Sequence, residues 1–354
     1  MEELNIDACS ICQLKCVRCP ATEMDYKSTI GQGYLRFEKF KRLIDANPQL
    51  QRVELENIGE LFLNPELLLI IEYAHSKNVQ IGCSVGANLN HATDEMLEGL
   101  VKYGFHNLTC SIDGASPETY AIYRVGGDFN RVMQNISKIN IFKKKYNSEL
   151  PKLKWQFIVF GHNEHEIPTA KKLATDLGME FIPKMSWDSE YSPIKDRDFV
   201  LRETGWSFLT RGEYEEVTGK CYLRSTCYSL WHSPRINWDG RVLGCCWNTW
   251  SDFGGNAFEQ GYMTAVNSDV MQRAKQLLMG QIGPADDIPC TICELYAKLA
   301  QTGEFLTSQE IYAQQSRWYL FARNLYRVSG LKRLDINVKL RNLVFRVRRF
   351  LKRA

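Results

Sequence analysis

The first half of the chain alternates short β-rich runs with helical segments, and this alternation limits the possible folds more than any other feature. The expected strands are residues 4–7, 52–56, 79–84, 107–113, 153–160 and 179–183. The expected helices lie between them, near residues 36–46, 65–77, 93–103, 129–146 and 164–177. Strands alternating with helices predict an α/β fold, a parallel sheet or a partial (β/α)6 barrel like a TIM barrel, with functional loops at the carboxyl ends of the strands.

Composition excludes several classes of protein. The chain has 354 residues, of which 44% are hydrophobic, and a net charge of +3, which is too small to indicate nucleic acid by itself. We expect no signal peptide before the first cysteines. The apolar runs fall short of the roughly 18 residues of a membrane-spanning helix. Twelve cysteines in a chain of this kind favour metal binding or catalysis in the cytoplasm over a disulfide scaffold.

Three cysteines directly follow the first expected strand. Cys12, Cys16 and Cys19 have the spacing C-x3-C-x2-C. Thiolates are soft ligands that suit zinc and iron–sulfur clusters. Structural zinc usually takes four protein ligands, and Cys9 is available as the fourth. Alternatively, three thiolates can hold a cubane cluster and leave one iron open to a small molecule.

This spacing and its place before a βα array resemble the radical SAM superfamily, and the resemblance extends over about residues 4–183. Gly59 and Glu60 match half of the Gly-Gly-Glu-Pro stretch that contacts the SAM amino group in that family. Ser84 and Gly86 match its Ser/Thr-Asn-Gly turn, in which Val85 here replaces the Asn.

The strongest resemblance is the stretch "SIDGASPETYAIYRVGG". Its Ser111, Asp113 and Arg124 fall where relatives place SAM-contacting and active-site groups, and an Arg suits a bidentate grip on the methionine carboxylate. The resemblance implies a [4Fe–4S] cluster, SAM on its open iron, and a reductant such as flavodoxin or ferredoxin. It also implies cleavage of SAM to a 5′-deoxyadenosyl radical that removes a hydrogen atom from the substrate.

A second cysteine region follows. The segment "INWDGRVLGCC" predicts a β-hairpin that turns at Asp239 and Gly240. The hairpin would bring Cys227 and Cys245 together, and Cys290 and Cys293 can close the site. The pattern resembles a SPASM/twitch domain of the one-cluster twitch form, which implies a second [4Fe–4S] cluster. Zinc is the alternative.

A fully ligated second cluster could accept an electron from the substrate, or it could only stabilise its domain.

The expected domains are a partial barrel at 1–185, a linker at 186–220, the auxiliary domain at 221–300 and a helical tail at 301–354. The tail is strongly basic over residues 331–354 and carries an apolar stripe. It predicts either contact with an anionic membrane surface, at the inner face of the membrane, or docking on its own protein.

Two further residues are candidates for catalysis. Cys246 could donate a hydrogen atom to a substrate radical, which would turn an oxidation into an epimerisation, although most spare cysteines are buried hydrophobes. Asp188 lies beyond the sixth expected strand and could act as a base, although surface carboxylates are commoner.

Three functions remain open from the sequence. The first is a radical SAM dehydrogenase or epimerase that acts on a sugar, aminocyclitol or alcohol-like small molecule. The second is modification of a ribosomally made peptide, which is disfavoured because the cysteines begin at residue 12 and leave no room upstream for a leader-binding domain. The third is a non-catalytic metal protein that binds nucleic acid through its tail, but it leaves the SAM-like stretches unexplained, so we expect no nucleic-acid partner.

Overall fold

The computed structural model describes residues 2–23, 28–56 and 58–315. It divides into two units, residues 1–305 and 306–354, which we describe separately. In the second unit the described part contains helix α14 (Ser308–Gln315). The basic segment 331–354 lies outside the described residues, so the tail helix stays a prediction. Within the described residues, no helix is both long enough and apolar enough to cross a membrane.

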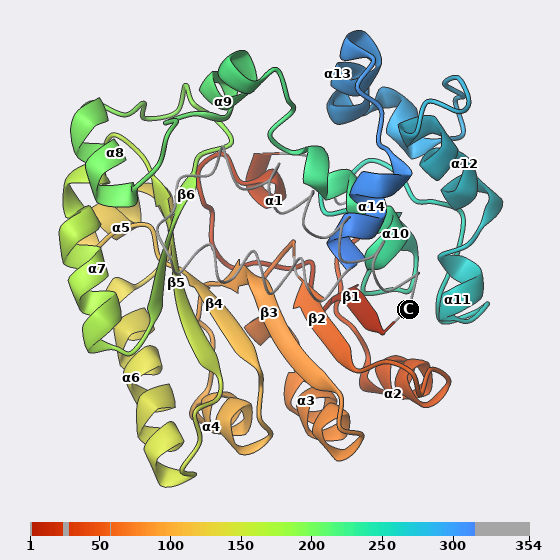
Figure 1. The fold of residues 1–354 in the computed structure, drawn as a ribbon. Coiled ribbons are helices and arrows are strands. Elements are labelled where there is room, and N and C mark those ends of the chain that lie inside the picture. Colours follow the sequence, from red (N-terminus) through yellow and green to blue (C-terminus); the bar gives the residue numbers. More distant parts are fainter. Residues whose placement is uncertain (1, 24–27, 57, 316–354) are drawn as a thin grey trace, which may run out of the picture. The chain divides into compact units, whose positions relative to one another are not determined.

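The first unit is built on a single sheet with the strand order β6-β5-β4-β3-β2-β1-β7-β8 among the described residues (Figure 1). Six consecutive strands run parallel: β1 (Glu3–Asp7), β2 (Arg52–Glu56), β3 (Gln80–Ala87), β4 (Asn107–Ser111), β5 (Lys152–Val159) and β6 (Glu180–Met185). All six match strands expected from the sequence to within a few residues. The parallel α/β fold is therefore confirmed.

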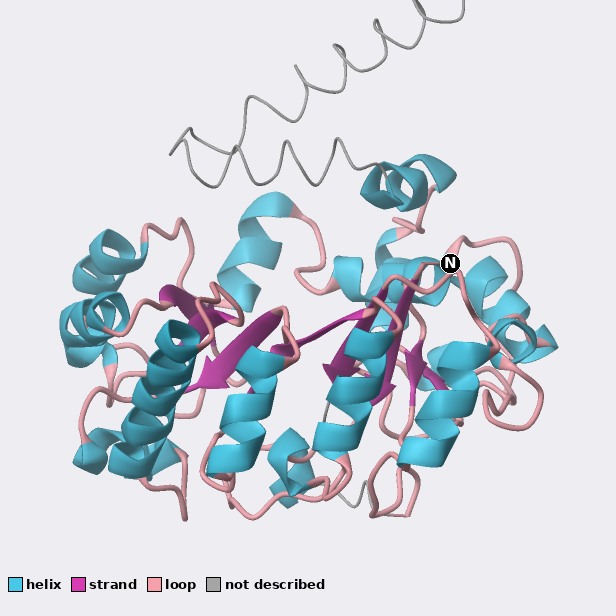
Figure 2. Cartoon of the chain, turned by 90° about the horizontal axis from the view of Figure 1, so that it is seen from below, coloured by secondary structure: helices cyan, strands magenta, loops and turns pink. Residues whose placement is uncertain are grey.

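Helices follow the strands and cover one face of this sheet, as Figure 2 shows. They are α2 (Phe37–Asp45), α3 (Leu67–Ser76), α4 (Asp94–Lys102), α6 (Phe129–Lys145) and α7 (Ile167–Asp176). Helix α5 (Pro117–Tyr123) was not expected. Its sequence nevertheless contains the usual signals of a helix start, because the Ser116 side chain caps the helix and Pro117 occupies the first turn.

Side chains on the two faces of the sheet differ in character because successive residues of a strand point to opposite sides. Leu4, Ile6, Val53 and Leu55 are buried and apolar, as expected for the face beneath the helices. The alternate positions carry polar residues, including Asn5, Glu54, Ser84, Asn107 and Gln156. We call this second side the inner face. The register places Asn5 beside Glu54 on neighbouring strands.

The hairpin predicted in the second cysteine region forms and joins the same sheet. Strand β7 (Arg235–Ile236) pairs in parallel with β1, and β8 (Val242–Gly244) pairs antiparallel with β7. Gly240 has φ +96°, a left-handed conformation that glycine adopts without strain at a tight turn. The second cysteine region is thereby attached to the edge of the strand that precedes the first cysteines.

The interval 186–220, expected to be a linker, contains two helices, α8 (Arg197–Thr204) and α9 (Arg211–Thr218). The side chains of Asp196 and Thr210 cap their starts, and left-handed glycines end them. A linker role for this interval stays a prediction.

The remaining short elements are α1 (Pro20–Glu23), η1 (Leu61–Leu63), η2 (Glu164–Glu166), η3 (Arg224–Tyr228), α10 (Ser229–His232), α11 (Tyr262–Ala265), α12 (Asp269–Leu278), η4 (Pro289–Ile292) and α13 (Glu294–Thr302).

Candidate active site

The first three cysteines lie in the loop after β1, against one apolar surface. Cys16 is buried and packs with Tyr123, Ile158 and Phe160, while Cys12 and Cys19 are partly buried against the same cluster. The loop is fixed to the end of α5, because backbone N–H groups of residues 15 and 17 donate to carbonyls of residues 125 and 123 at 2.9 and 3.2 Å. We call this surface the cysteine wall. It lies at the carboxyl ends of the strands, where the sequence predicts functional loops.

Two polar side chains point at these sulfurs. Arg124 Nη1 donates to Cys16 Sγ at 3.7 Å, and Asn88 Nδ2 donates to Cys12 Sγ at 3.8 Å. Burial raises the pKa of the Cys16 thiol, whereas the adjacent Arg124 guanidinium lowers it. Donors of this kind stabilise negative charge on sulfur ligands. Asn88 was missed from the sequence, although "GANLN" places it two residues after the Gly of the compared turn.

The described residues contain no three Cys, His, Asp or Glu side chains already arranged as a metal site. The ligand roles of Cys12, Cys16 and Cys19 therefore stay predictions. The donor set fits an iron–sulfur cluster in its chemistry, because all three are soft sulfur donors on one wall with hydrogen-bond donors beside them.

Asp113 and Arg124 form a tight pair at this wall. Arg124 Nε and Nη2 both lie 2.6 Å from Asp113 Oδ2, and Asp113 Oδ1 accepts the backbone N–H of Ile158 at 2.6 Å. Asp113 is fully buried. The carboxylate thus orients the guanidinium toward Cys16, and the two residues act as one unit.

Ser111 and Gly86 lie in contact on the inner face. A Cβ on Gly86, which has φ +115°, would lie 2.1 Å from Ser111 Oγ, so only glycine fits. Gln156 Nε2 is 3.4 Å from the same hydroxyl. Its Oε1 is buried with no partner among the described residues, an acceptor left open in the interior.

Gly59 and Glu60 connect the cysteine loop to the end of β3. A Cβ on Gly59 would lie 2.1 Å from the Ile11 carbonyl oxygen, and the Glu60 N–H donates to that oxygen at 2.7 Å. Glu60 Oε2 accepts the backbone N–H of Asn88 at 2.7 Å, and Oε1 that of Phe62 at 3.2 Å. Burial raises the pKa of Glu60 to about 7, and these N–H groups oppose the shift. The carboxylate therefore holds two loops together, and its contact with SAM stays a prediction.

Ser84 is exposed on the inner face, where its hydroxyl accepts from Asn107 Nδ2 at 2.9 Å. It also bonds to the carboxylate of Glu54, which lowers the pKa of that group, although burial of Glu54 raises it more strongly. The structure thus gives Ser84 polar partners within the sheet, and its predicted SAM contact is untested. Cys83 and Cys110, on the strands nearby, are buried as expected for spare cysteines.

The second set of cysteines gathers at the end of the hairpin. Cys227, Cys245, Cys290 and Cys293 are all buried, at 9% exposure or less. Burial raises the pKa of Cys290, and negative charge on each of the other three raises it further. The four thiols are therefore near neighbours, although residues 227 and 293 are far apart in sequence. Their role as ligands of a second cluster stays a prediction, supported by this proximity and by their soft donors.

Cys246 differs from Cys245 because its side chain is exposed. Its carbonyl accepts from Arg235 Nη1 at 3.4 Å. Negative charge on Cys246 raises the pKa of Lys184, a residue of β6. The sequence analysis had not singled out Lys184.

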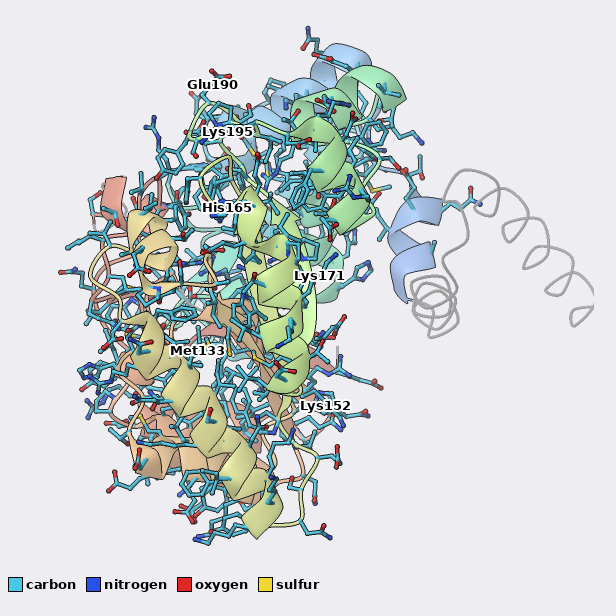
Figure 3. The ribbon with its side chains drawn as sticks, turned by 90° about the vertical axis from the view of Figure 1, so that its left-hand side faces the viewer. Met133, Lys152, His165, Lys171, Glu190 and Lys195 are labelled. Carbon is cyan, nitrogen blue, oxygen red and sulfur yellow. The ribbon has the colours of Figure 1, made fainter. Side chains whose placement is uncertain are left out.

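Asp188 lies in the loop after β6, but its carboxylate is engaged. Oδ2 pairs with Arg18 Nε at 3.0 Å, and Oδ1 accepts the N–H groups of Glu190 and Tyr191 at 2.9 and 3.2 Å. Figure 3 shows Glu190 and Lys195 well away from Lys152 at the start of β5, so this loop is at the carboxyl end of the sheet. The contacts indicate that Asp188 fastens the loop to the cysteine loop. Its proposed role as a base is untested.

A cavity of about 270 Å³ lies under this loop. Its wall includes Phe160 of the cysteine wall, Asp188, Tyr191 and the Arg197–Glu213 ion pair that joins α8 to α9. His162 borders the loop through a 2.8 Å contact between Nδ1 and Ser192 Oγ. The helices of the interval 186–220 therefore enclose space next to the predicted cluster.

Comparison with known proteins shows which families share this arrangement. Residues 8–172 match the Radical SAM superfamily. The chain is 26% identical over 225 residues to the AdoMet-dependent heme synthase of Methanosarcina barkeri. That match covers 61% of this chain and 59% of the relative, so the chain spans about three fifths of its length.

Two solved structures share the fold. Streptococcus suis SuiB bound to S-adenosylmethionine superposes with a TM-score of 0.57 at 15% identity, over 83% of this chain and 71% of SuiB. The enzyme anSMEcpe with bound AdoMet and the Cp18Cys peptide gives a TM-score of 0.53 at 15% identity, over 93% of this chain and 99% of that chain. At these identities the likeness establishes the fold alone.

Proposed function

The chain carries a radical SAM domain, and on that premise we propose that it removes a hydrogen atom from a small polar substrate, leading to oxidation or epimerisation. The cysteine wall carries this proposal, because it places three soft ligands beside the Asp113–Arg124 pair at the carboxyl ends of the strands. When bound, the cluster and SAM supply the radical chemistry. A flavodoxin or ferredoxin would supply the electron.

The residues of this chain would position these groups. Cys12, Cys16 and Cys19 would hold the cluster, and Asn88 and Arg124 would donate hydrogen bonds to its sulfur ligands. The predicted SAM contacts come from both sides of the wall: Gly59, Glu60, Ser84, Ser111, Asp113 and Arg124. Glu60 already joins, through hydrogen bonds, the two loops that would form this site. It would therefore orient the backbone around SAM as well as contact SAM.

Polar atoms of the inner face favour the proposal of a small substrate with several hydroxyl or amino groups. Asn5 Oδ1, Glu54 Oε2 and Gln156 Oε1 are buried acceptors without partners among the described residues. Buried polar atoms normally have hydrogen-bond partners, so orphaned acceptors on a strand face suit a ligand that donates. A sugar, an aminocyclitol or an alcohol has such donors.

The fate of the substrate radical would depend on the second cysteine region. Residues 221–300 would form the auxiliary domain, and a cluster held by its four buried cysteines would supply an electron acceptor, which favours oxidation. Cys246 supports epimerisation as the second candidate, because its thiol is exposed, unlike the four buried cysteines beside it in this region. The thiol would return a hydrogen atom to the opposite face of the substrate, and an electron from the flavodoxin or ferredoxin with a proton from solvent would reduce the resulting thiyl radical to the thiol.

Anaerobic reconstitution with iron and sulfide tests the proposal. We expect about eight irons per chain, from two four-iron clusters, and slow release of 5′-deoxyadenosine after addition of dithionite and SAM. Cys12→Ala, Cys16→Ala and Cys19→Ala should each abolish the release, whereas Cys221→Ala, outside both sets, should retain it. Bound zinc, or no SAM cleavage from fully loaded protein, would overturn the proposal. Substrate screening then compares sugars and aminocyclitols with peptides, since SuiB has been solved with a precursor peptide.

A further inference from the structure

Three polar side chains lie near one another on the inner face of β1, β2 and β4 (Figure 1). Asn5 is in register with Glu54, and Glu54 with Gly82 of β3. A Cβ on Gly82 would lie 2.3 Å from Asn107 Oδ1 and 3.0 Å from Glu54 Oε1, so the missing side chain lets these two oxygens converge. Asn107 Oδ1 is also 3.3 Å from His106 Nδ1 and keeps its second lone pair. We call Asn5, Glu54 and Asn107 the acceptor row.

Neighbouring hydrogen bonds determine which atoms of the acceptor row are left open. Asn5 Nδ2 donates to the carbonyl and the hydroxyl of Ser233, at 3.2 Å each, and its Oδ1 has no partner among the described residues. Asn107 Nδ2 donates to Ser84 Oγ at 2.9 Å, which leaves its Oδ1 toward Glu54. Glu54 Oε2 is buried and also lacks a partner among the described residues. The row therefore presents oxygen acceptors, one of them a carboxylate.

The cations beside the acceptor row have other acids as their partners. These ion pairs are Arg235–Asp7, Arg52–Glu3 and Lys152–Glu149. Burial raises the pKa of the Glu54 carboxyl, whereas a hydrogen bond from Ser84 and the charge of Arg52 lower it in part. A largely buried carboxylate in these surroundings is stabilised by a cation that brings its own hydrogen-bond donors.

The acceptor row can be reached from the inner face, below the predicted SAM contacts. Its three residues are partly exposed, and Ser84 beside them is exposed. Gly82 precedes Gly86, the neighbour of Ser111, by four residues of β3, which corresponds to about 13 Å along a strand. A six-membered ring held at the row by one substituent would therefore lie between the row and the cofactor.

We propose that the acceptor row binds a protonated amino group of the substrate, with the Glu54 carboxylate as its counter-ion. An ammonium group carries donors and no acceptor, which matches a site made of oxygen acceptors. Hydrogen bonds between an ammonium and a carboxylate are charge-assisted, whereas a hydroxyl would leave the carboxylate without a counter-ion. The assignment rests on the proposed function and narrows its substrate class to amines, such as an aminocyclitol or an amino sugar.

Thermal unfolding of the iron-loaded full-length protein, without oxygen, tests this assignment. The probe is methylammonium. Tetramethylammonium, which has the charge but no N–H donor, and potassium are compared with it at the same ionic strength. We expect methylammonium at about ten times its dissociation constant to raise the midpoint about 2–4 °C above that in tetramethylammonium. Equal midpoints in the three salts would overturn the assignment. An equal rise with potassium would overturn it too, because the site would then bind a metal ion.

Variants connect the response to the acceptor row. Glu54→Gln should abolish the difference between methylammonium and tetramethylammonium, and a difference that persists would contradict the assignment. Glu180→Gln is the control: it removes an acid that already pairs with Lys154 at 3.6 Å, so it should retain the difference. If Glu54→Gln does not load iron, Asn5→Ala replaces it and should weaken the response, because one acceptor is lost.

The measurement needs no SAM cleavage, so the two proposals can fail separately. Protein that responds to methylammonium but cleaves no SAM would contradict the proposed function and leave the amine site standing. Protein that cleaves SAM but does not respond would overturn the amine site alone.

Discussion

Arg235 of β7 and Asp7 of β1 form a buried ion pair that joins the two cysteine regions. Arg235 Nη2 lies 2.5 Å from Asp7 Oδ1, and Nε lies 3.1 Å from Oδ2. Asp7 ends the strand that leads into the first cysteine loop, and Arg235 opens the hairpin that leads to Cys245. Because Arg235 Nη1 also donates to the Cys246 carbonyl, one guanidinium contacts both regions.

We therefore predict that Arg235→Met strongly destabilises the protein. Removing one partner of a buried pair leaves an uncompensated charge, which costs about 3–5 kcal/mol. The control is Arg273→Met, which removes an exposed pair with Asp287 and should cost less than about 1 kcal/mol. Anaerobic denaturant unfolding measures both, and adding Asp7→Leu to Arg235→Met should recover part of the loss. Equal costs for the two single variants would contradict the prediction.

A second prediction concerns Asn88. Asn88→Ala removes the donor to Cys12 Sγ and the acceptor that Gln13 Nε2 and the Asn90 backbone N–H each use at 2.9 Å, but it keeps the backbone N–H that binds Glu60. Removing such partners of metal ligands typically costs 10-fold to 100-fold, so we expect 5′-deoxyadenosine release to fall by about 10-fold. Asn140→Ala is the control, because among the described residues its amide bonds only to the Leu177 carbonyl, in a distant part of the fold. Unchanged release would show that the contact has no role.

The sequence was a good guide to the sheet because each parallel strand is a local β-rich run followed by a helix. It was a poor guide to β7, which is only two residues long and forms by pairing with a strand more than two hundred residues earlier. The Asp7–Arg235 pair was missed for the same reason. The match to the Radical SAM superfamily confirms the resemblance drawn from the cysteines, whereas the SPASM/twitch domain stays a prediction.

Side-chain roles were harder to predict than strands. Asp188 follows the last parallel strand, which made it a candidate base, but its position in sequence does not reveal that Arg18 and two backbone N–H groups engage it. Lys184 was missed because a lysine near a strand end is usually an ordinary surface residue. Only the register with Ile158 shows that it lies beside the cysteine wall.

A third prediction uses two glycines. Gly59→Ala should displace the cysteine loop, because the new Cβ would lie 2.1 Å from a backbone oxygen that cannot move independently. We expect the iron content of the first cluster to fall by roughly half or more, since mispositioned ligands weaken metal binding. Gly212→Ala is the control: its Cβ would meet only Thr210 Oγ1 at 3.7 Å within α9, so stability should rise by about 0.5–1 kcal/mol. Full iron loading of Gly59→Ala would show that the loop adapts.

A fourth prediction separates the two functions of the Asp188 carboxylate. Asp188→Asn loses the charge that pairs with Arg18 but keeps an oxygen for the N–H groups of Glu190 and Tyr191. Asp188→Ala loses both. Because the ion pair is partly exposed, its loss should cost less than about 1 kcal/mol. Hydrogen exchange at residues 190 and 191 should therefore be near wild type in the Asn variant and several-fold faster in the Ala variant. Equal exchange in both variants would show that the Asp188 side chain does not protect these two N–H groups.

The last prediction decides between the two outcomes proposed for the substrate radical. In deuterated water the Cys246 thiol carries deuterium, so an epimerisation that uses this thiol would place deuterium at the inverted carbon of the product. Cys246→Ala should then abolish formation of the epimer and the incorporation of deuterium together. An oxidation instead gives a product that has lost hydrogen, without deuterium at that carbon, and the Cys246→Ala variant should still form it. Mass spectrometry of the product made by wild type and variant distinguishes the two cases. Deuterium that persists in the variant would exclude Cys246 as the donor, despite its exposed thiol.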